Sequence, residues 1–169
     1  MSCESNLIDY LKENKLVLAT AESCTAGEIM STLAKQGNCG NCLFIGYAVY
    51  SPIAKIKELD VKQSTIDKFT LTSEAIAREM VQGVFKHDEI NIAIATTGII
   101  GKEPIDGISP GTICFAWGFK KNKDIILFSA TKKFQGSSDE IVRQATQYSL
   151  NSLKKYHSQI KANDESFKP

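Results

Sequence analysis

The feature that most limits the possible folds is a series of short apolar runs, each of which ends in a polar turn. The runs are L-V-L-A-T at 16–20, L-F-I-G-Y-A-V-Y at 43–50 and I-N-I-A-I-A-T at 90–96. Apolar runs of this length that are bounded by turn residues are typical of buried β-strands. Segments with helical spacing separate them, and strands that alternate with helices predict an α/β protein.

The other expected elements complete one domain. Apolar spacing and capping residues predict helices over 4–14, from Thr25 to about Lys35, from Ser73 onward and over about 137–156, with short helical turns after Pro52 and at 64–69. The strands 112–119 and 124–131 flank K-K-N-K and predict an antiparallel hairpin. We therefore expect a mixed sheet covered by helices, in a single domain over 1–169. Its core would span about 5–156 and be followed by a polar, frayed tail at 157–169.

Composition and charge exclude several classes of function. The 20 basic and 19 acidic residues leave a net charge of +1, and the lysines form only short clusters. A nucleic-acid partner is therefore not expected. No segment resembles a signal peptide, and no apolar run approaches the ~20 residues that span a bilayer. We expect a cytoplasmic protein without a membrane partner, and five irregularly spaced cysteines agree with that location.

Polar residues follow the expected strands at four places. These are Glu22-Ser23-Cys24-Thr25 after the first strand, Tyr50-Ser51 before Lys55 after the second, Thr97-Gly98 after the third, and Gly111-Thr112 where the loop 99–111 re-enters the sheet. Ligands of open α/β sheets collect at the carboxyl ends of the strands. The four stretches could therefore line one cleft.

Ser23 is a candidate nucleophile, but it needs a base to take its proton. The chain has only two histidines, His87 and His157, and both are expected to be exposed imidazoles at helix ends. Lys55 is the remaining candidate, provided that burial or a nearby cation lowers its pKa from ~10.4. Tyr50 could relay the proton or fix the geometry. From these residues alone, this set has low specificity, and a helix cap, a half-buried tyrosine and a surface lysine are the simpler interpretation.

Three further features could bear on function. Thr25 and Glu28 match the S/T-x-x-E capping box, which would place Thr25 at the N-cap of a helix whose free N–H groups favour an anion. Cys24 is a rival nucleophile, or else a small buried residue. Cys39 and Cys42 form a C-x-x-C motif, but it follows a helix instead of opening one, as redox pairs do. A redox role for these two cysteines is the weakest of the hypotheses.

Several blocks in this order resemble the CinA C-terminal domain family, over roughly residues 5 to 153. They are T-A-E-S-C-T-A-G at 20–27, Y-S-P-I-A-K at 50–55, T-S-E at 72–74, A-T-T-G-I-I-G at 95–101, G-T at 111–112, and F-Q-G at 134–136 with Arg143. The resemblance implies a three-layer α/β/α fold. It also implies hydrolysis of nicotinamide mononucleotide to nicotinate mononucleotide and ammonia, with neither a metal nor a cofactor.

The resemblance also implies roles for individual residues. Ser23 would be the nucleophile, with Tyr50 and Lys55 beside it in the catalytic set. The nucleotide substrate would contact Glu22, Cys24, Thr25, Gly27, Thr97, Gly98, Gly111, Thr112 and Arg143. Self-assembly is expected as well, with a homodimer as the default.

The chain departs from the family pattern in its loops. Pro52 replaces an asparagine, and the loop T-G-I-I-G-K-E-P at 97–104 replaces T-G-x-A-G-P-G-G. G-S-S at 136–138 replaces G-D-R, which removes an arginine suited to phosphate, and a glycine pair survives only as Gly46. The alternative function is therefore a catalytically inactive or substrate-shifted member that binds a nucleotide-like ligand.

Overall fold

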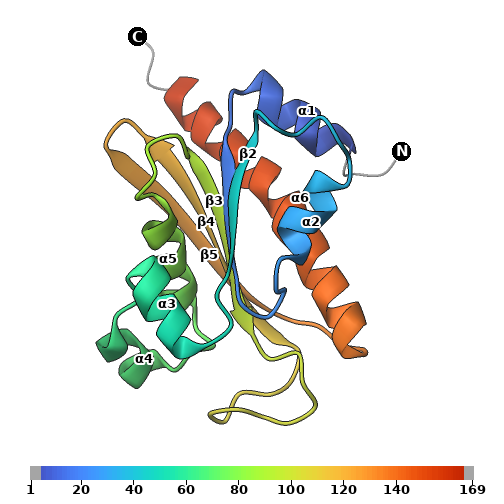
Figure 1. Cartoon of the computed structure of the whole chain (residues 1–169), viewed down its shortest axis with the longest axis vertical. Helices are drawn as coiled ribbons and strands as arrows, with labels where there is room; N and C mark the ends of the chain where they lie inside the picture. Colours follow the sequence, from blue (N-terminus) through green and yellow to red (C-terminus); the bar gives the residue numbers. More distant parts are fainter. Residues whose placement is uncertain (1–4, 166–169) are drawn as a thin grey trace.

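The computed structural model describes residues 5–165, which fold around one sheet (Figure 1). The elements in chain order are α1 Ser5–Glu13, β1 Leu18–Glu22, α2 Glu28–Ala34, β2 Leu43–Ala48, α3 Pro52–Leu59, α4 Gln63–Phe69, α5 Glu74–Val84, β3 Ile92–Gly98, β4 Thr112–Lys121, β5 Asp124–Lys133 and α6 Ser138–Glu165. Every helix and strand expected from the sequence is present. Residue 4, the expected start of the first helix, lies outside the described residues.

The sheet has the strand order β2-β1-β3-β4-β5. β1 pairs in parallel with β2 and β3, whereas β4 runs antiparallel to both β3 and β5. Four of the five strands therefore point the same way, which confirms a mixed, mostly parallel sheet. The carboxyl ends of β1, β2 and β3 share one end of the sheet, where ligands of such folds bind.

Helices cover both faces of the sheet, which confirms the three-layer α/β/α arrangement (Figure 1). α1, α2 and α6 enclose one apolar core, which contains Phe115 and Trp117. α3 and α5 enclose the other core, around Met80 and Val81, and α4 packs against α5. β1 is buried along its whole length between these layers, and β3 is buried up to its last residue. Burial on both faces explains why these two strands lack a strict polar and apolar alternation.

Local capping explains where two helices on one face begin. Ser51 is the N-cap of α3, where its Oγ accepts a hydrogen bond from the Ala54 N–H at 3.1 Å, and Pro52 is the first helical residue. Ser73 is the N-cap of α5, where its Oγ accepts from the Ile76 N–H at 3.3 Å. Both starts were predicted from the sequence and are confirmed. Side chains of this type satisfy N–H groups that have no partner within the helix.

β1 and β3 each begin and end two residues later than the sequence predicted. Leu16 and Ile90 lie ahead of the strands but are buried in the two cores, so the apolar run starts earlier than the strand. At the other end, Glu22 and Thr97 continue the strands because their polar side chains have buried hydrogen-bond partners. Apolar character alone therefore misplaced the strand ends that carry the polar residues.

α6 extends to Glu165, whereas the sequence predicted a helix end near 156 and a frayed tail from 157. The longer helix is held by aromatic contacts. Tyr156 stacks on Phe128, with ring centroids 4.4 Å apart, and His157 stacks on Phe119 at 5.9 Å. Residues 166–169 of the expected tail lie outside the described residues. Neither α6 nor any other helix within 5–165 is long and apolar enough to cross a membrane.

Candidate active site

Two polar side chains meet at the carboxyl end of β1. Ser23 directly follows β1, and Lys55 lies near the start of α3, which follows β2 after three residues. The Lys55 Nζ is 2.8 Å from the Ser23 Oγ. Because β1 and β2 are parallel neighbours, the chain segments that leave them start side by side. The structure thus brings the expected nucleophile and base into direct contact.

The Lys55 amine is enclosed by protein. Lys55 is only 2% exposed, and its Nζ also donates to the Val49 carbonyl at 2.8 Å and to the Tyr50 carbonyl at 3.2 Å. Within the described residues, no acidic side chain forms an ion pair with it. Burial lowers the pKa of Lys55 from 10.5 to about 8, because the charged amine loses its hydration. Part of the amine population is therefore neutral near neutral pH.

The three contacts of this amine suit both of its protonation states. A charged ammonium has three N–H donors, one each for the serine oxygen and the two carbonyl oxygens. A neutral amine has two donors and one lone pair. Carbonyl oxygens can only accept, so in the neutral state they hold both donors and leave the lone pair facing the Ser23 hydroxyl. That hydroxyl can then donate its proton to Lys55, as general-base catalysis requires.

The loop after β1 is held by the buried carboxylate of Glu22. Its Oε2 accepts hydrogen bonds from Thr25 Oγ1 at 2.7 Å and from the N–H groups of Gly27 and Ile29 at 3.0 and 3.1 Å. Its Oε1 accepts from the Met30 N–H at 3.0 Å. These N–H groups belong to the start of α2. Glu22 therefore caps that helix with a full negative charge, which also matches the positive end of the helix dipole.

This arrangement corrects two expectations. Thr25 is not the N-cap of α2, because the N-cap is Gly27, whose φ is 98° and which has no side-chain cap bond. The Glu28 carboxylate accepts a bond from Thr32 instead of completing a capping box. The start of the helix is also not open to an anionic ligand, since Glu22 occupies it. The capping-box prediction was wrong because a charged acceptor from the strand competes better for the N–H groups than a hydroxyl does.

Thr96 on β3 is a site residue that the sequence analysis missed. Its carbonyl accepts the Ser23 N–H at 3.0 Å, and its Oγ1 lies 2.7 Å from the Thr25 Oγ1. Thr96 therefore fixes both the backbone of the nucleophile and the side chain that supports Glu22. Thr96 could have been found from the parallel pairing of the two strands, because it lies directly opposite Glu22 near their carboxyl ends.

Cys24, the rival nucleophile, is buried beside the pair. Burial raises the pKa of the Cys24 thiol to about 12, so the thiol stays protonated at neutral pH. A protonated thiol is a poor nucleophile. The expected benefit from the helix end is absent because Glu22 occupies that end. The geometry favours Ser23 over Cys24.

Two backbone N–H groups next to Ser23 have no oxygen acceptor among the described residues. In the part of the chain that the structure describes, the N–H groups of Cys24 and Thr25 donate to no carbonyl and to no side-chain oxygen. The next groups are engaged, since Ala26 donates to the Ser23 carbonyl at 3.2 Å and Glu28 donates to the Thr25 carbonyl at 2.9 Å. Free amides beside a nucleophile are suited to stabilising an oxyanion.

Tyr50 contributes its carbonyl, and not its hydroxyl, to the Lys55 contacts. Its side chain is 70% exposed, and its hydroxyl forms no hydrogen bond with any described residue. The expected proton relay through Tyr50 is therefore not assembled in this structure. A ring in this position is free to close over a bound ligand.

The expected ligand residues on β3 and in the loop before β4 have structural partners. Thr97 Oγ1 donates to the Leu71 carbonyl at 2.9 Å. A Cβ at Gly98 would lie 2.6 Å from a carbonyl oxygen of β4, and a Cβ at Gly111 would lie 2.1 Å from the Phe134 carbonyl oxygen. The φ of Gly111 is +82°, so this position requires glycine for two reasons. These residues shape the end of the sheet.

Thr112 and Arg143 do not contact the Ser23 pair. The Thr112 carbonyl accepts the Ile99 N–H at 3.0 Å, at the start of β4. Arg143 is exposed on α6, where its charge helps to lower the pKa of Glu140, after the hydrogen bonds that the Glu140 carboxylate accepts from Ser137. The sequence could not show on which face of its helix Arg143 would lie.

The two histidines lie at the opposite end of the sheet from Ser23. His87 sits in the segment that leads into β3, where its Nε2 is 2.9 Å from the Tyr47 hydroxyl. His157 lies 2.7 Å from the Tyr10 hydroxyl, and burial lowers its pKa. Both are half-buried beside aromatic rings, which corrects the expectation of exposed imidazoles. Neither can serve Ser23 as a base, in agreement with the sequence analysis.

Cys39 and Cys42 lie between α2 and β2 as buried free thiols. The Cys39 thiol donates to the Leu33 and Gly37 carbonyls, and the Cys42 thiol donates to the Cys39 carbonyl at 3.4 Å. Burial raises the pKa of Cys42, which disfavours the reactive thiolate. Within residues 5–165, no three His, Cys, Asp or Glu side chains gather in a way that could hold a metal ion.

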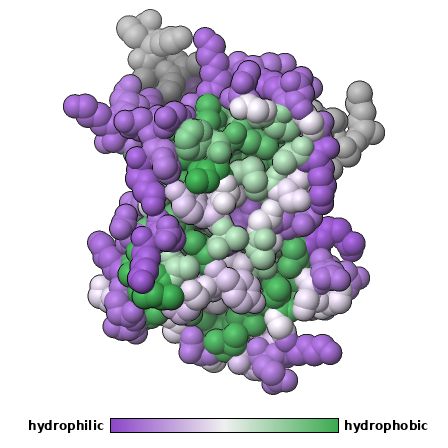
Figure 2. Space-filling model, in the orientation of Figure 1, coloured by the Kyte–Doolittle hydropathy of each residue, from purple (hydrophilic) through white to green (hydrophobic). Residues whose placement is uncertain are grey.

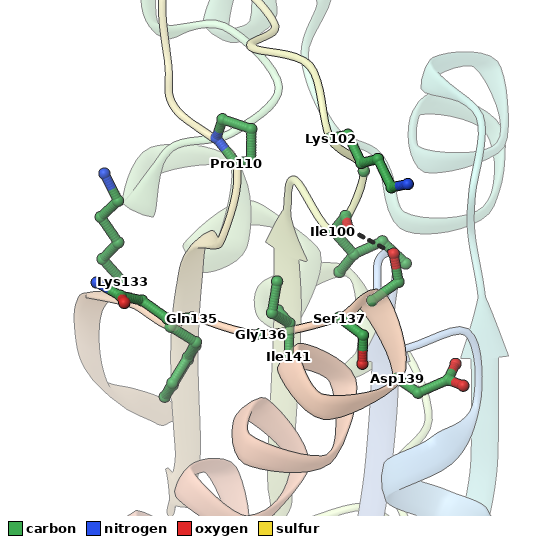
Figure 3. A pocket seen from close by; sticks show the side chains of 12 residues that line it. Ile100, Lys102, Pro110, Lys133, Gln135, Gly136, Ser137, Asp139 and Ile141 are labelled. Atoms are coloured by element: carbon green, nitrogen blue, oxygen red, sulfur yellow. Dashed lines mark hydrogen bonds between the residues drawn. The ribbon is translucent and has the colours of Figure 1, made fainter.

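A cavity of about 640 Å³ opens at the end of the sheet where Ser23 lies. It is formed by the loop after β3, the end of β5 and the start of α6 (Figure 3). Lys102 and Lys133 line it, together with the backbone of Gly136. Ser138 Oγ donates to the Ile100 carbonyl at 2.7 Å and joins two of its walls (Figure 3). Its size suits a small-molecule ligand. Neither Ser23 nor Lys55 lines this cavity.

Comparisons with known proteins find similarity to one protein family. The profile of the CinA C-terminal domain matches residues 1–157. Protein YdeJ of Escherichia coli (strain K12) is 31% identical over 150 residues, which cover 88% of this chain and 85% of YdeJ. A CinA-like protein of Petrotoga mobilis is 35% identical over 150 residues, but the matched region covers only 36% of that longer protein.

Solved structures show the same fold. The competence damage-inducible protein A of Klebsiella pneumoniae superposes with a TM-score of 0.86 at 29% identity, over 92% of this chain and 94% of that chain. The competence or damage-inducible protein of Enterobacter asburiae gives a TM-score of 0.82 at 32% identity, over 89% and 92% of the two chains. The chain spans 36% or less of the curated relatives other than YdeJ that it matches here.

The role of the Glu22 carboxylate can be tested by removing its charge. Glu22→Gln should lower the free energy of unfolding by roughly 2–3 kcal/mol, because an amide NH₂ would face N–H groups that need an acceptor. Glu28→Gln removes the same charge from the start of the same helix and should change stability by less than about 0.5 kcal/mol. Urea unfolding measures both. Equal losses in the two variants would contradict the assignment of Glu22 as the cap.

Proposed function

The chain belongs to the CinA C-terminal domain family, and we propose that it is an amidohydrolase that converts nicotinamide mononucleotide to nicotinate mononucleotide and ammonia. The choice of substrate rests on the resemblance of residues 20–27 and 50–55 to members with that activity. The choice of reaction rests on the chemistry of the site. A serine with a buried amine at its hydroxyl is suited to acyl transfer.

The observation that carries the proposal is the 2.8 Å contact between Lys55 Nζ and Ser23 Oγ in a buried setting. An exposed lysine would be almost fully charged at neutral pH and could not accept a proton. Burial lowers the pKa of Lys55 to about 8, so roughly a quarter of the amine is neutral at pH 7.5. This fraction can act as a base without the help of histidine.

The proposed reaction has two halves. In the first, Lys55 takes the Ser23 proton while the Ser23 Oγ forms a bond to the amide carbon, and the oxyanion lies against the N–H groups of Cys24 and Thr25. The C–N bond then breaks, and Lys55 returns the proton to the departing ammonia. In the second half, water loses a proton to Lys55 and attacks the acyl-serine ester. The ester C–O bond then breaks, Lys55 gives its proton to the Ser23 Oγ, and nicotinate mononucleotide is released.

The nucleotide part of the substrate would lie toward the 640 Å³ cavity. Thr96, whose carbonyl binds the Ser23 N–H, is four residues from Ile100, which lines the cavity. Four extended residues span at most about 14 Å, so one small ligand can reach both places. Lys102 and Lys133 would supply positive charge for its phosphate in place of the arginine missing at 136–138.

A second candidate function is ligand binding without turnover. Ser23 is only 8% exposed and does not line the 640 Å³ cavity, so a substrate in that cavity would reach it only if the surrounding loops moved. The loops at 98–104 and 136–138 are also the segments that depart most from the family pattern. A pure binding protein would be stabilised thermally by nicotinamide mononucleotide but would release no ammonia from it.

Catalysis is tested by ammonia release from nicotinamide mononucleotide. The wild type should release ammonia, whereas Ser23→Ala and Lys55→Met should each lose about a thousandfold or more in rate, because nucleophile and base act as a unit. Lys57→Met removes an exposed lysine from the same helix and should keep the wild-type rate. A wild type without turnover would exclude the deamidase. Full activity in Lys55→Met would exclude lysine as the base.

The pH dependence gives an independent test of the base. Lys55 acts in its neutral form and its pKa is lowered to about 8, so kcat/KM should rise about tenfold per pH unit below pH 8 and level off above it. Lys55→Arg should be inactive throughout, because a guanidinium keeps its proton. A rate that falls or stays constant between about pH 6 and pH 8 would contradict general-base catalysis by Lys55.

A further inference from the structure

The 640 Å³ cavity is formed largely by the segments in which this chain departs from the family pattern. The loop 97–104 contributes three of the lining residues, and the segment 136–138 contributes all of its three. Ser23 and Lys55, by contrast, keep the family pattern and lie outside the cavity. The two departures therefore meet at one place. This indicates an unchanged reaction at Ser23 and a changed ligand group in the cavity.

Apolar and basic side chains line the cavity together. Ile100, Pro110 and Ile141 are apolar, and Figure 3 shows them between Lys102 on one side and Lys133 on the other. Figure 2 shows apolar residues at the lower end of the molecule, where the loop after β3 leaves the sheet, with hydrophilic residues beside them. Surfaces of this mixed kind suit a ligand that combines a flat apolar ring with charged groups.

The charged groups at the cavity are available to a ligand. Within residues 5–165, Lys102 and Asp139 form neither a hydrogen bond nor an ion pair through their side chains. In the same part of the chain, the Lys133 Nζ donates only to the Ser109 Oγ, at 3.0 Å and in an exposed position. A phosphate oxygen is a stronger acceptor than a hydroxyl, so a phosphate would replace Ser109 at this amine. A carboxylate such as that of Asp139 can accept hydrogen bonds from ribose hydroxyls.

The volume of the cavity exceeds what a mononucleotide can fill. A ribose phosphate has about 13 non-hydrogen atoms and fills at most ~400 Å³, at the roughly 30 Å³ that one water-sized group occupies in a liquid. The cavity measures about 640 Å³. The nicotinamide ring would lie outside it, because its amide has to reach Ser23, which does not line the cavity. A mononucleotide would therefore leave a large part of the cavity empty.

The charges of the cavity fit two phosphates better than one. A terminal phosphate carries a charge of about −1.5 to −2 and is bound well by arginine, which this chain lacks at 136–138. A phosphate that is bonded to two ester groups carries about one negative charge. Lys102 and Lys133 are single charges on opposite sides of the cavity, so each can face one phosphate of a diphosphate (Figure 3).

We propose that the preferred substrate is a dinucleotide, in which the phosphate of nicotinamide mononucleotide is joined to a second nucleotide. This inference rests on the proposed amidohydrolase activity and specifies its substrate. The amide reacts at Ser23, and the diphosphate binds Lys102 and Lys133. The base of the second nucleotide contacts the apolar side chains of the cavity, and its ribose hydroxyls reach Asp139. The amide and one water give a carboxylic acid and ammonia, and the second nucleotide is unchanged.

Substrate choice is tested by ammonia release from nicotinamide adenine dinucleotide and from nicotinamide mononucleotide, with the wild-type protein. The kcat/KM for the dinucleotide should be higher by about tenfold or more, because only the dinucleotide fills the cavity. Lys133→Ala should lower the kcat/KM for the dinucleotide about tenfold, because a charged contact is lost. Lys132→Ala is the matched control and should keep the wild-type value, since Lys132 lies over the Tyr148 ring and does not line the cavity.

The possible results separate this inference from the proposed function. A kcat/KM for the mononucleotide that equals or exceeds that for the dinucleotide would overturn the inference and leave the amidohydrolase intact. If neither compound releases ammonia, the amidohydrolase fails and calorimetry decides. The Kd of the dinucleotide should then be about tenfold or more below that of the mononucleotide. Equal affinities, absence of dinucleotide binding, or equal effects of Lys133→Ala and Lys132→Ala would overturn the inference.

Discussion

The burial of one amine organises this end of the molecule. Lys55 reaches from the start of α3 to the serine that follows β1, and so it links two segments that are far apart in the sequence. An enclosed ammonium is unfavourable unless its donors are satisfied, and here the Ser23 hydroxyl and two carbonyls satisfy them. The same enclosure lowers the pKa of Lys55. The burial that fixes Lys55 in place is therefore also what lowers its pKa and lets its amine act as a base.

Glu22 allows Ser23 to hold its position. A helix start after a strand usually offers its N–H groups to an anionic ligand. Here the protein fills that place with its own carboxylate, and only the amides of Cys24 and Thr25 stay open beside the nucleophile. The helix end thus serves to fix the loop, while the oxyanion would be held by the turn before the helix. Thr96 ties this turn to the neighbouring strand.

The sequence was sufficient for the order of elements and the mixed sheet, because these depend on apolar runs and turns. Strand ends made Ser23 and Lys55 candidates, but only the structure shows that the two side chains are in contact. The prediction from sequence failed where contacts between residues far apart in the chain determine the local structure. Glu22 displaced the local capping box of Thr25, and the exposed positions of Tyr50 and Arg143 depend on packing that spacing alone does not reveal. The length of α6 was also missed, since the turn around Tyr156 and His157 is held by aromatic contacts with β4 and β5.

The central claim is that burial lowers the pKa of Lys55 to about 8, so that part of its population is neutral near neutral pH. The most direct measurement is an NMR titration of the wild-type protein with isotope-labelled lysine, with the Lys55 signal assigned by its loss in Lys55→Met. The account predicts that this signal titrates with a midpoint at about pH 8, well below the ordinary pKa of a lysine. A Lys55 signal that stays in its charged form up to about pH 10 would contradict the account.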